Sequence, residues 1–127
     1  MRACWLGLVL LAAACGGQQP DTAPPQVVAV VPEPGSSGVA ADTTIAIQFD
    51  EDIDRDSLND SLFHVSSGER DLFGKVSYDL QTRWATLVML APLPAGETVT
   101  AVLEAGVRDL IGNRRQTAYS WSFTVAR

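Results

Sequence analysis

The stretch Tyr119-Ser120-Trp121-Ser122-Phe123-Thr124-Val125 decides the fold. Apolar or aromatic residues alternate with hydroxyl-bearing residues over these seven positions. Successive side chains of a β-strand point to opposite faces of a sheet. The alternation therefore predicts a strand with one buried face, which carries Trp121 and Phe123.

The same period of two recurs along the chain, and turns rich in Gly, Pro and Asp separate the segments. We predict seven strands, at residues 26–31, 44–49, 63–65, 75–79, 84–90, 98–103 and 119–125. Residues 50–62 are the one segment that could form a helix. They have room for a single turn capped by Ser57, but they lack the apolar stripe of a packed helix. Short antiparallel strands at this spacing favour an all-β sandwich or barrel.

Composition restricts the function. The chain has 127 residues and a formal net charge of −6, with an isoelectric point near 4.5. This balance argues against a nucleic-acid partner, because phosphate binding needs a basic face. Hydrophobic residues make up 46%, which argues against a disordered chain, and a single His excludes a multi-histidine metal site.

Residues 1–14 are predicted to be a lipoprotein signal peptide. Arg2 precedes an apolar run over residues 5–14, which is shorter than the roughly 20 residues of a membrane-spanning helix and has the length of a secretory signal core. The run ends in Ala12-Ala13-Ala14-Cys15. This end resembles a bacterial lipobox, although a lipobox more often has Leu at the position of Ala12.

The lipobox resemblance implies diacylglycerol on the Cys15 sulfur, cleavage before Cys15 and acylation of the new amine. Gly16 follows the cysteine, which resembles the outer-membrane default of enteric bacteria. We therefore expect a lipid-anchored protein of the bacterial cell envelope, held at the outer membrane. An ordinary signal peptide cut after an Ala, or an uncleaved anchor, are the alternatives.

A tether and one domain follow the signal. Residues 15–25 comprise the lipidated cysteine and a segment rich in Gly, Pro and Gln, which predicts a flexible, disordered tether. Residues 26–127 show no internal repeat and are predicted to form one domain. Cys4 leaves with the signal and Cys15 becomes the anchor, so we expect no disulfide in the mature chain.

Several short motifs occur in a characteristic order. They are Pro32-Glu33-Pro34-Gly35, residues 43–51, residues 92–96, Gly106-Val107-Arg108-Asp109-Leu110-Ile111-Gly112-Asn113 and Ser122-Phe123-Thr124. Their order and spacing resemble the bacterial Ig-like domain of the S-layer type, the SbsA Ig-like domain, over residues 25–127. The resemblance implies an Ig-like β-sandwich of about seven antiparallel strands, with roles in spacing, assembly and adhesion and no family-wide catalytic residues.

The loop before the last strand contains a predicted structural turn at Asp109, Gly112 and Asn113. Asp accepts hydrogen bonds from nearby amides, Gly supplies a positive φ, and Asn caps locally. We expect Leu110 to fold back onto the core, and we weigh a cation site as the alternative. The neighbouring pair Arg114-Arg115 is interpreted as a solvated basic spot, with an acidic partner as the alternative.

The densest charge lies at residues 50–56, where five carboxylates occur in seven positions. Oxygen ligands suit Ca²⁺, so Asp50, Asp52 and Asp54 are candidate metal ligands. The spacing lacks the Gly and the final Glu of an EF-hand loop, and a solvated loop with Ile53 tucked inward is the alternative. No other cofactor is indicated.

Two remaining side chains bear on function. The family resemblance implies that Ala85 and Leu87 face inward, so Trp84 is expected on the outward face of its strand, as a contact site for a sugar or a protein or as cover for the sheet. His64 is expected to face solvent, and no nucleophile motif accompanies it, so we predict that the protein is not an enzyme.

These observations predict a non-catalytic envelope lipoprotein whose single Ig-like domain mediates binding or assembly near the membrane. Its partners are the membrane, through the lipid on Cys15, and an envelope protein. The alternative is a glycan- or Ca²⁺-binding adhesion module, which would use Trp84 or the acidic loop.

Overall fold

The computed structural model describes residues 23–127. The predicted signal peptide and lipidation site, Cys15 included, lie outside the described residues. Among residues 23–127, no helix has the length and apolar character needed to cross a membrane.

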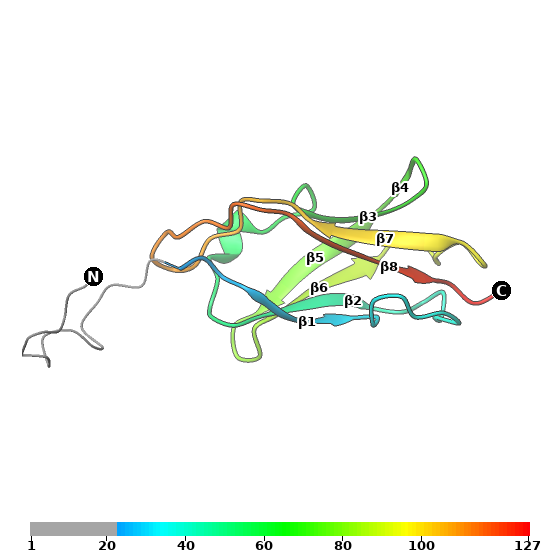
Figure 1. Cartoon of the computed structure of the whole chain (residues 1–127), viewed down its shortest axis with the longest axis horizontal. Coiled ribbons are helices and arrows are strands. Elements are labelled where there is room, and N and C mark those ends of the chain that lie inside the picture. The colour runs from blue at the N-terminus through cyan, green and yellow to red at the C-terminus, as the bar shows by residue number, and fades with distance from the viewer. Residues whose placement is uncertain (1–22) are drawn as a thin grey trace, which may run out of the picture.

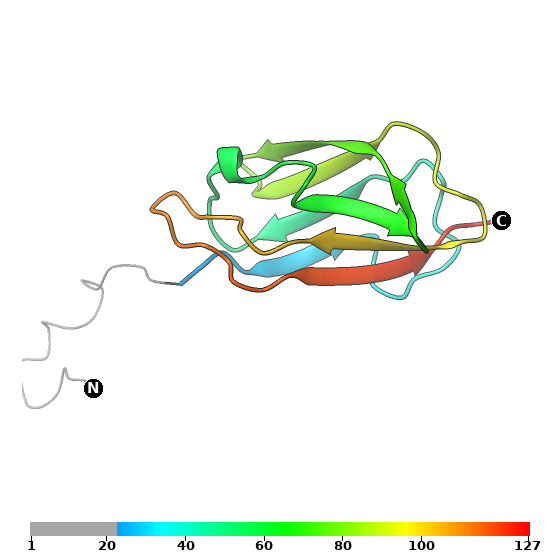
Figure 2. The ribbon, with the colours of Figure 1, turned by 90° about the horizontal axis from the view of Figure 1, so that it is seen from above.

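The described chain is all-β, and it folds into two four-stranded antiparallel sheets stacked as an Ig-like sandwich, as the sequence predicted (Figures 1 and 2). One sheet has the order β1-β2-β6-β5 and the other the order β4-β3-β7-β8. The strands are β1 (Val27–Val31), β2 (Ile45–Phe49), β3 (Phe63–Ser67), β4 (Arg70–Leu72), β5 (Gly74–Asp79), β6 (Trp84–Met89), β7 (Thr98–Leu103) and β8 (Tyr119–Thr124).

The sequence missed β4 and placed a helix cap wrongly. β4 has three residues, too few to display an alternation. The single turn of 3₁₀ helix, η3 (Arg55–Ser57), is capped by Asp54, whose side chain accepts from the Asp56 amide. The predicted cap by Ser57 was wrong, because Ser57 ends this turn and its hydroxyl donates back to the Asp54 carbonyl oxygen.

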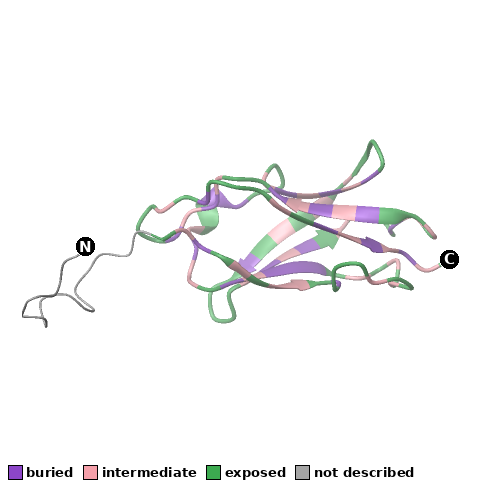
Figure 3. Ribbon diagram, viewed as in Figure 1, coloured by how far each residue is buried: buried purple, intermediate pink, exposed green. Residues whose placement is uncertain are grey.

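The core lies between the sheets and follows the pleat, so buried and exposed residues alternate along the strands (Figure 3). β8 pairs with β7 over six positions, from Thr98 opposite Thr124 to Leu103 opposite Tyr119. Trp121 and Phe123 point inward from β8, as predicted. The largest fully buried side chains are Phe49, Phe63, Phe123, Ile45, Ile47, Ile53, Leu87 and Leu103, followed by four valines.

Trp121 also carries a buried side-chain hydrogen bond that ties β8 to the segment after β1. Its indole N–H donates to the Pro32 carbonyl oxygen at 2.9 Å in a buried setting. Its ring lies 6.5 Å from that of Phe63 and 5.9 Å from that of Tyr119, measured between centroids. The residue therefore contributes both apolar packing and a satisfied donor.

We expect Trp121→Phe to lower the free energy of unfolding by about 1–3 kcal/mol, since it leaves the buried Pro32 carbonyl without its donor. Trp121→Ala should cost about 3–5 kcal/mol, because it also leaves a cavity. Urea unfolding followed by circular dichroism measures both. Trp84→Phe, on the outward face of β6, is the matched control, and an equal loss in this control would contradict the assignment.

Candidate functional site

Two loops meet at the end of the sandwich where the described chain begins (Figures 1 and 2). One follows β2 and contains η3, and the other, residues 104–118, joins β7 to β8. Ile53 and Asp109 form an isolated antiparallel bridge between them. The Asp54 amide donates to the Arg108 carbonyl oxygen at 2.8 Å, so backbone pairing fixes the two loops together.

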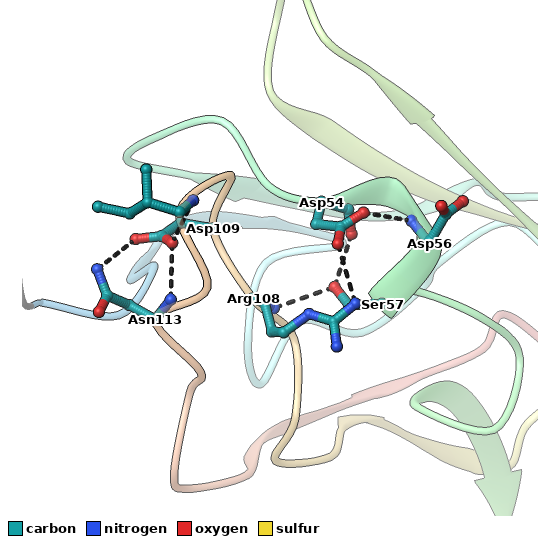
Figure 4. A network of polar contacts seen from close by, with 7 residues as sticks. Asp54, Asp56, Ser57, Arg108, Asp109 and Asn113 are labelled. Atoms are coloured by element: carbon teal, nitrogen blue, oxygen red, sulfur yellow. Dashed lines mark hydrogen bonds and ion pairs between the residues drawn. The ribbon is translucent and has the colours of Figure 1, made fainter.

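A side-chain network reinforces this junction (Figure 4). The Arg108 guanidinium binds the Asp54 carboxylate at 2.9 Å. The Ser57 hydroxyl oxygen accepts from the Arg108 amide at 3.0 Å. Hydrogen bonds from the Asp56 amide and from Arg108 hold the pKa of Asp54 below its usual range. Asp54 is thus used as a cap and an ion-pair partner.

Ile53 fixes the acidic loop from the core side. Its side chain is fully buried, as the sequence suggested for a loop with this residue tucked inward. Its amide donates to the Tyr78 hydroxyl oxygen at 3.3 Å. Burial raises the pKa of this tyrosine.

Asp109 organises the tip of the other loop (Figure 4). One carboxylate oxygen accepts from the amides of Ile111 and Asn113, at 3.0 and 2.8 Å, and the other accepts from the Asn113 side chain at 2.8 Å. Gly112 has a φ of 99°. Asp109 is only 3% exposed. Burial alone would raise the pKa of Asp109, but the Asn113 and Ile111 hydrogen bonds hold it below the usual range.

Leu110 does not fold back onto the core, and that prediction was wrong. It is 64% exposed and the adjacent Ile111 is 66% exposed. The Asp109 carboxylate draws the amides of the turn inward, which directs these two side chains outward. Local hydrogen bonding, rather than hydrophobicity, decides their position.

The three candidate metal ligands have separate partners. Asp50 accepts from the Gln26 amide at 2.9 Å, Asp52 pairs with Arg83 at 3.3 Å, and Asp54 pairs with Arg108. Across the described residues, no group of three or more His, Cys, Asp or Glu side chains is arranged to hold a metal ion. The structure therefore does not bring Asp50, Asp52 and Asp54 together.

Arg83 is a structural residue that the sequence did not reveal. It ends the β5–β6 turn with a φ of 64°, a left-handed conformation that side chains seldom adopt. Besides its contact with Asp52, its guanidinium donates to the Asp50 carbonyl oxygen at 3.1 Å. The turn is thereby tied to the acidic loop.

Arg115 was expected to be solvated, and the structure corrects this, because the side chain is 8% exposed. Its guanidinium donates to the Pro25 carbonyl oxygen at 3.3 Å and to the Gln26 side-chain oxygen at 3.4 Å. These acceptors lie about ninety positions away in the sequence, so no local pattern indicates them. Arg115 fastens the start of the domain to the β7–β8 loop.

Trp84 lies on the outward phase of β6, since Ala85 and Leu87 are buried and Trp84 is only partly covered. Its neighbours across the sheet are Gln48 on β2 and Asp79 on β5.

His64, on β3, is bound to Glu104 at 2.7 Å, and both side chains are partly exposed. The pleat turns His64 away from the buried Phe63 and Val65. This pair bridges β3 to the end of β7 on the outer face of the second sheet.

A cleft of about 640 Å³ opens beside β4 and β5, where the chain passes from one sheet to the other. Buried residues such as Leu87 form part of its lining, and Phe73 and Leu90 at its rim are 70% and 75% exposed. The Leu90 amide donates to the Phe73 carbonyl oxygen at 2.9 Å, which places the two residues together. A Cβ at Gly74 would lie 2.8 Å from the Val88 carbonyl oxygen, so this crossing requires glycine.

Comparison with protein families identifies the chain. The family described as "Bacterial Ig-like domain" matches residues 21–125, and the chain belongs to this family. Membership suggests an extracytoplasmic or cell-envelope protein. No curated protein sequence matches the chain significantly.

Solved structures share the sandwich. Domains 1–6 of the surface layer protein SbsC superpose with a TM-score of 0.60 at 23% identity, over 80% of this chain and only 14% of SbsC. CopC from Methylosinus trichosporium OB3b gives 0.65 at 13% identity, over 80% of this chain and 93% of CopC. PcoC, a methionine-rich copper resistance protein from Escherichia coli, superposes with a TM-score of 0.66 at 18% identity, over 81% of this chain and 99% of PcoC. Identities this low show the fold alone.

We expect Asp109→Ala to lower the free energy of unfolding by about 1–3 kcal/mol at neutral pH, because it leaves the turn amides without an acceptor. A carboxylate with a lowered pKa stabilises the fold above its unfolded pKa of about 3.9 and loses this effect as pH falls through the folded pKa. The difference from the parent should therefore shrink below about pH 4. Denaturant melts at pH 7 and pH 3 measure it, with the exposed Asp60→Ala as control. A difference that is independent of pH would contradict a charged Asp109.

Proposed function

We propose that this protein is a non-catalytic cell-envelope lipoprotein whose single Ig-like domain binds an envelope protein or assembles with it near the membrane. Family membership supports the envelope location, and the motifs of residues 32–35 and 106–113 support the S-layer type within the family. The proposed anchor is the lipid on Cys15, in the outer membrane, and Ala12-Ala13-Ala14-Cys15 supports it.

The observation that carries the proposed binding role is the apolar rim of the cleft. Phe73 and Leu90 lie together and are mostly exposed, and Val88 on β6 is also exposed. Contiguous exposed apolar side chains of this kind mark interaction sites. Their position beside a concave surface with a buried apolar floor gives a partner both a rim and a recess.

The free edge of β5 adds backbone groups to this surface. β5 pairs with β6 on one side, and within residues 23–127 no strand pairs with its other side. By contrast, the outer edge of β8 is covered, since the Gly35 amide donates to the Ser122 carbonyl oxygen and the Thr124 amide donates to that of Ser36. An uncovered edge strand accepts an added strand from a partner.

The polar side chains of the described domain support a non-catalytic role. His64, the sole histidine, is occupied by Glu104. Asp54 and Asp109 serve as caps with lowered pKa values, whereas a general base at neutral pH needs a pKa near 7.

Glycan binding is a second candidate, favoured by Trp84. Its indole is partly exposed on the open face of the first sheet, between Gln48 and Asp79. Sugars are commonly held by stacking on an aromatic face with polar groups at its border. Binding that is lost in Trp84→Ala but retained when the cleft rim is altered would favour this candidate.

The anchor is tested with Cys15→Ser in cells that express the full chain. We expect the parent to sediment with membranes and to incorporate labelled palmitate, because two or three acyl chains hold a protein firmly at a bilayer. Cys15→Ser should lose the label and appear in the soluble envelope fraction, and Cys4→Ser is the control. A Cys15→Ser chain that stays with the membrane would contradict a lipid anchor.

The binding surface is tested by crosslinking in living cells. Phe73→Ser with Leu90→Ser should reduce recovery of the partner by at least about tenfold, as expected when central apolar contacts are truncated. Val28→Ser, an exposed position on β1, is the matched control. Undiminished recovery from the doubly substituted chain would show that the partner does not use the cleft.

A further inference from the structure

Leu110 and Ile111 are adjacent apolar side chains at the tip of the β7–β8 loop, each about two-thirds exposed. A single exposed apolar residue needs no explanation. A neighbouring pair on a projecting tip is different, because neither side chain contributes to the core and both raise the free energy of the protein in water.

The tip is held firmly. The Asp109 carboxylate binds the amides of Ile111 and Asn113. Arg108 and Arg114 form an antiparallel bridge at the base of the tip, and Ile53 bridges to Asp109 from the neighbouring loop. These bonds fix the conformation of the turn, and this conformation directs Leu110 and Ile111 outward, away from the domain.

This loop lies at the end of the domain from which the chain leads back to Cys15. Both ribbon views place the β7–β8 loop beside the start of the described chain, away from the C-terminus (Figures 1 and 2). The bonds from Arg115 to Pro25 and Gln26 join the loop directly to that start. Hydrogen bonds therefore join the β7–β8 loop to the first residues of the domain.

The distance to Cys15 is short. Eight residue steps separate Cys15 from Ala23, the first described residue. A fully extended chain covers at most about 3.3–3.6 Å per residue, so the span is at most roughly 28 Å. A lipid on Cys15 would hold this end of the domain within that distance of a bilayer.

Charge does not oppose an approach of the β7–β8 loop to lipid. The loop after β2 is acidic, but two of its carboxylates are paired, Asp52 with Arg83 and Asp54 with Arg108. Further arginines in the two loops are Arg55, Arg114 and Arg115. The β7–β8 loop itself carries Arg108, Arg114 and Arg115 against Glu104 and Asp109, so the loop is not negatively charged. The apolar pair rather than an electrostatic patch is the feature that this loop presents.

We propose that Leu110 and Ile111 insert into the lipid interface and orient the domain on its membrane. This inference rests on the proposed lipid anchor. The occupant of the apolar tip is a bilayer surface, because the short link to Cys15 fixes which surface the tip meets. A tethered loop needs little intrinsic affinity, since tethering supplies a high effective concentration of lipid. This orientation also directs the opposite end of the sandwich, where β6 ends, away from the membrane (Figure 1).

The test supplies the anchor chemically, so that it does not depend on acylation by cells. The chain from Cys15 onward retains every described residue, and Cys15 is its only cysteine. Its thiol is coupled to a maleimide lipid in phosphatidylcholine vesicles with either ordinary or brominated acyl chains. Ile111→Trp reports contact of the tip with lipid, because bromine quenches indole fluorescence.

The introduced indole joins Trp84 and Trp121, so full insertion should remove about one third of the emission in brominated vesicles. Leu90→Trp, at an exposed apolar position just after β6, is the matched control and should show the same emission change as the parent. Leu110→Ser in the Ile111→Trp chain should reduce the quenching. Quenching no greater than in Leu90→Trp, or undiminished by Leu110→Ser, would overturn the proposal.

The outcome is separable from that of the proposed function. Failure of palmitate labelling in cells would remove the anchor but leave a quenched Ile111→Trp as evidence that the tip binds lipid. Normal labelling with an unquenched tip would keep the lipoprotein and overturn the insertion. Thermal melts of each coupled variant verify that the domain stays folded.

Discussion

The pairing of β7 with β8 is the constraint on which the rest of the sandwich depends. Its six-position register fixes which side chains of both strands face inward, and a slip by one residue would exchange the two faces. β3 then adds to β7, and the opposite sheet packs its own inner face, centred on β2 and β6, against this surface. The hydrogen bond from Trp121 to Pro32 adds to this packing, because it ties the edge strand β8 to the segment that follows β1.

The features that followed from the sequence are those determined within a few residues. Alternation identified the strands, since the pleat imposes a period of two wherever one face is buried. The outward position of Trp84 was inferred from the resemblance to the Ig-like family. β4 was not predicted, because three residues are too few to show an alternation of apolar and polar positions. The Asp109 turn could be predicted because its determinants are local. Asp109 accepts from amides two and four positions away, and Gly112 supplies the positive φ.

The features that the sequence did not indicate depend on partners far along the chain or on competition between local bonds. The burial of Arg115 requires the carbonyl of Pro25, which only the fold brings near. The outward position of Leu110 follows from the demand of a nearly buried carboxylate for donors, which outweighs the burial of one apolar side chain. The acidic loop looked like a cation site because residue types carry no information about orientation. In the fold its carboxylates turn toward Gln26, Arg83 and Arg108.

Hydrogen bonds and packing act together at the end of the sandwich where the described chain begins, since Ile53 and Val107 of the two loops belong to the core. Asp54, Arg108, Asp109 and Arg115 add hydrogen bonds to this packing. Asp109 is the most buried of these side chains, and both of its carboxylate oxygens accept hydrogen bonds. The same bonds leave Leu110 and Ile111 outside, so the stability of the turn and the exposure of its tip have one cause. A substitution that loosened Asp109 would let the pair collapse inward, and the domain would then lose the apolar surface that we infer meets the lipid.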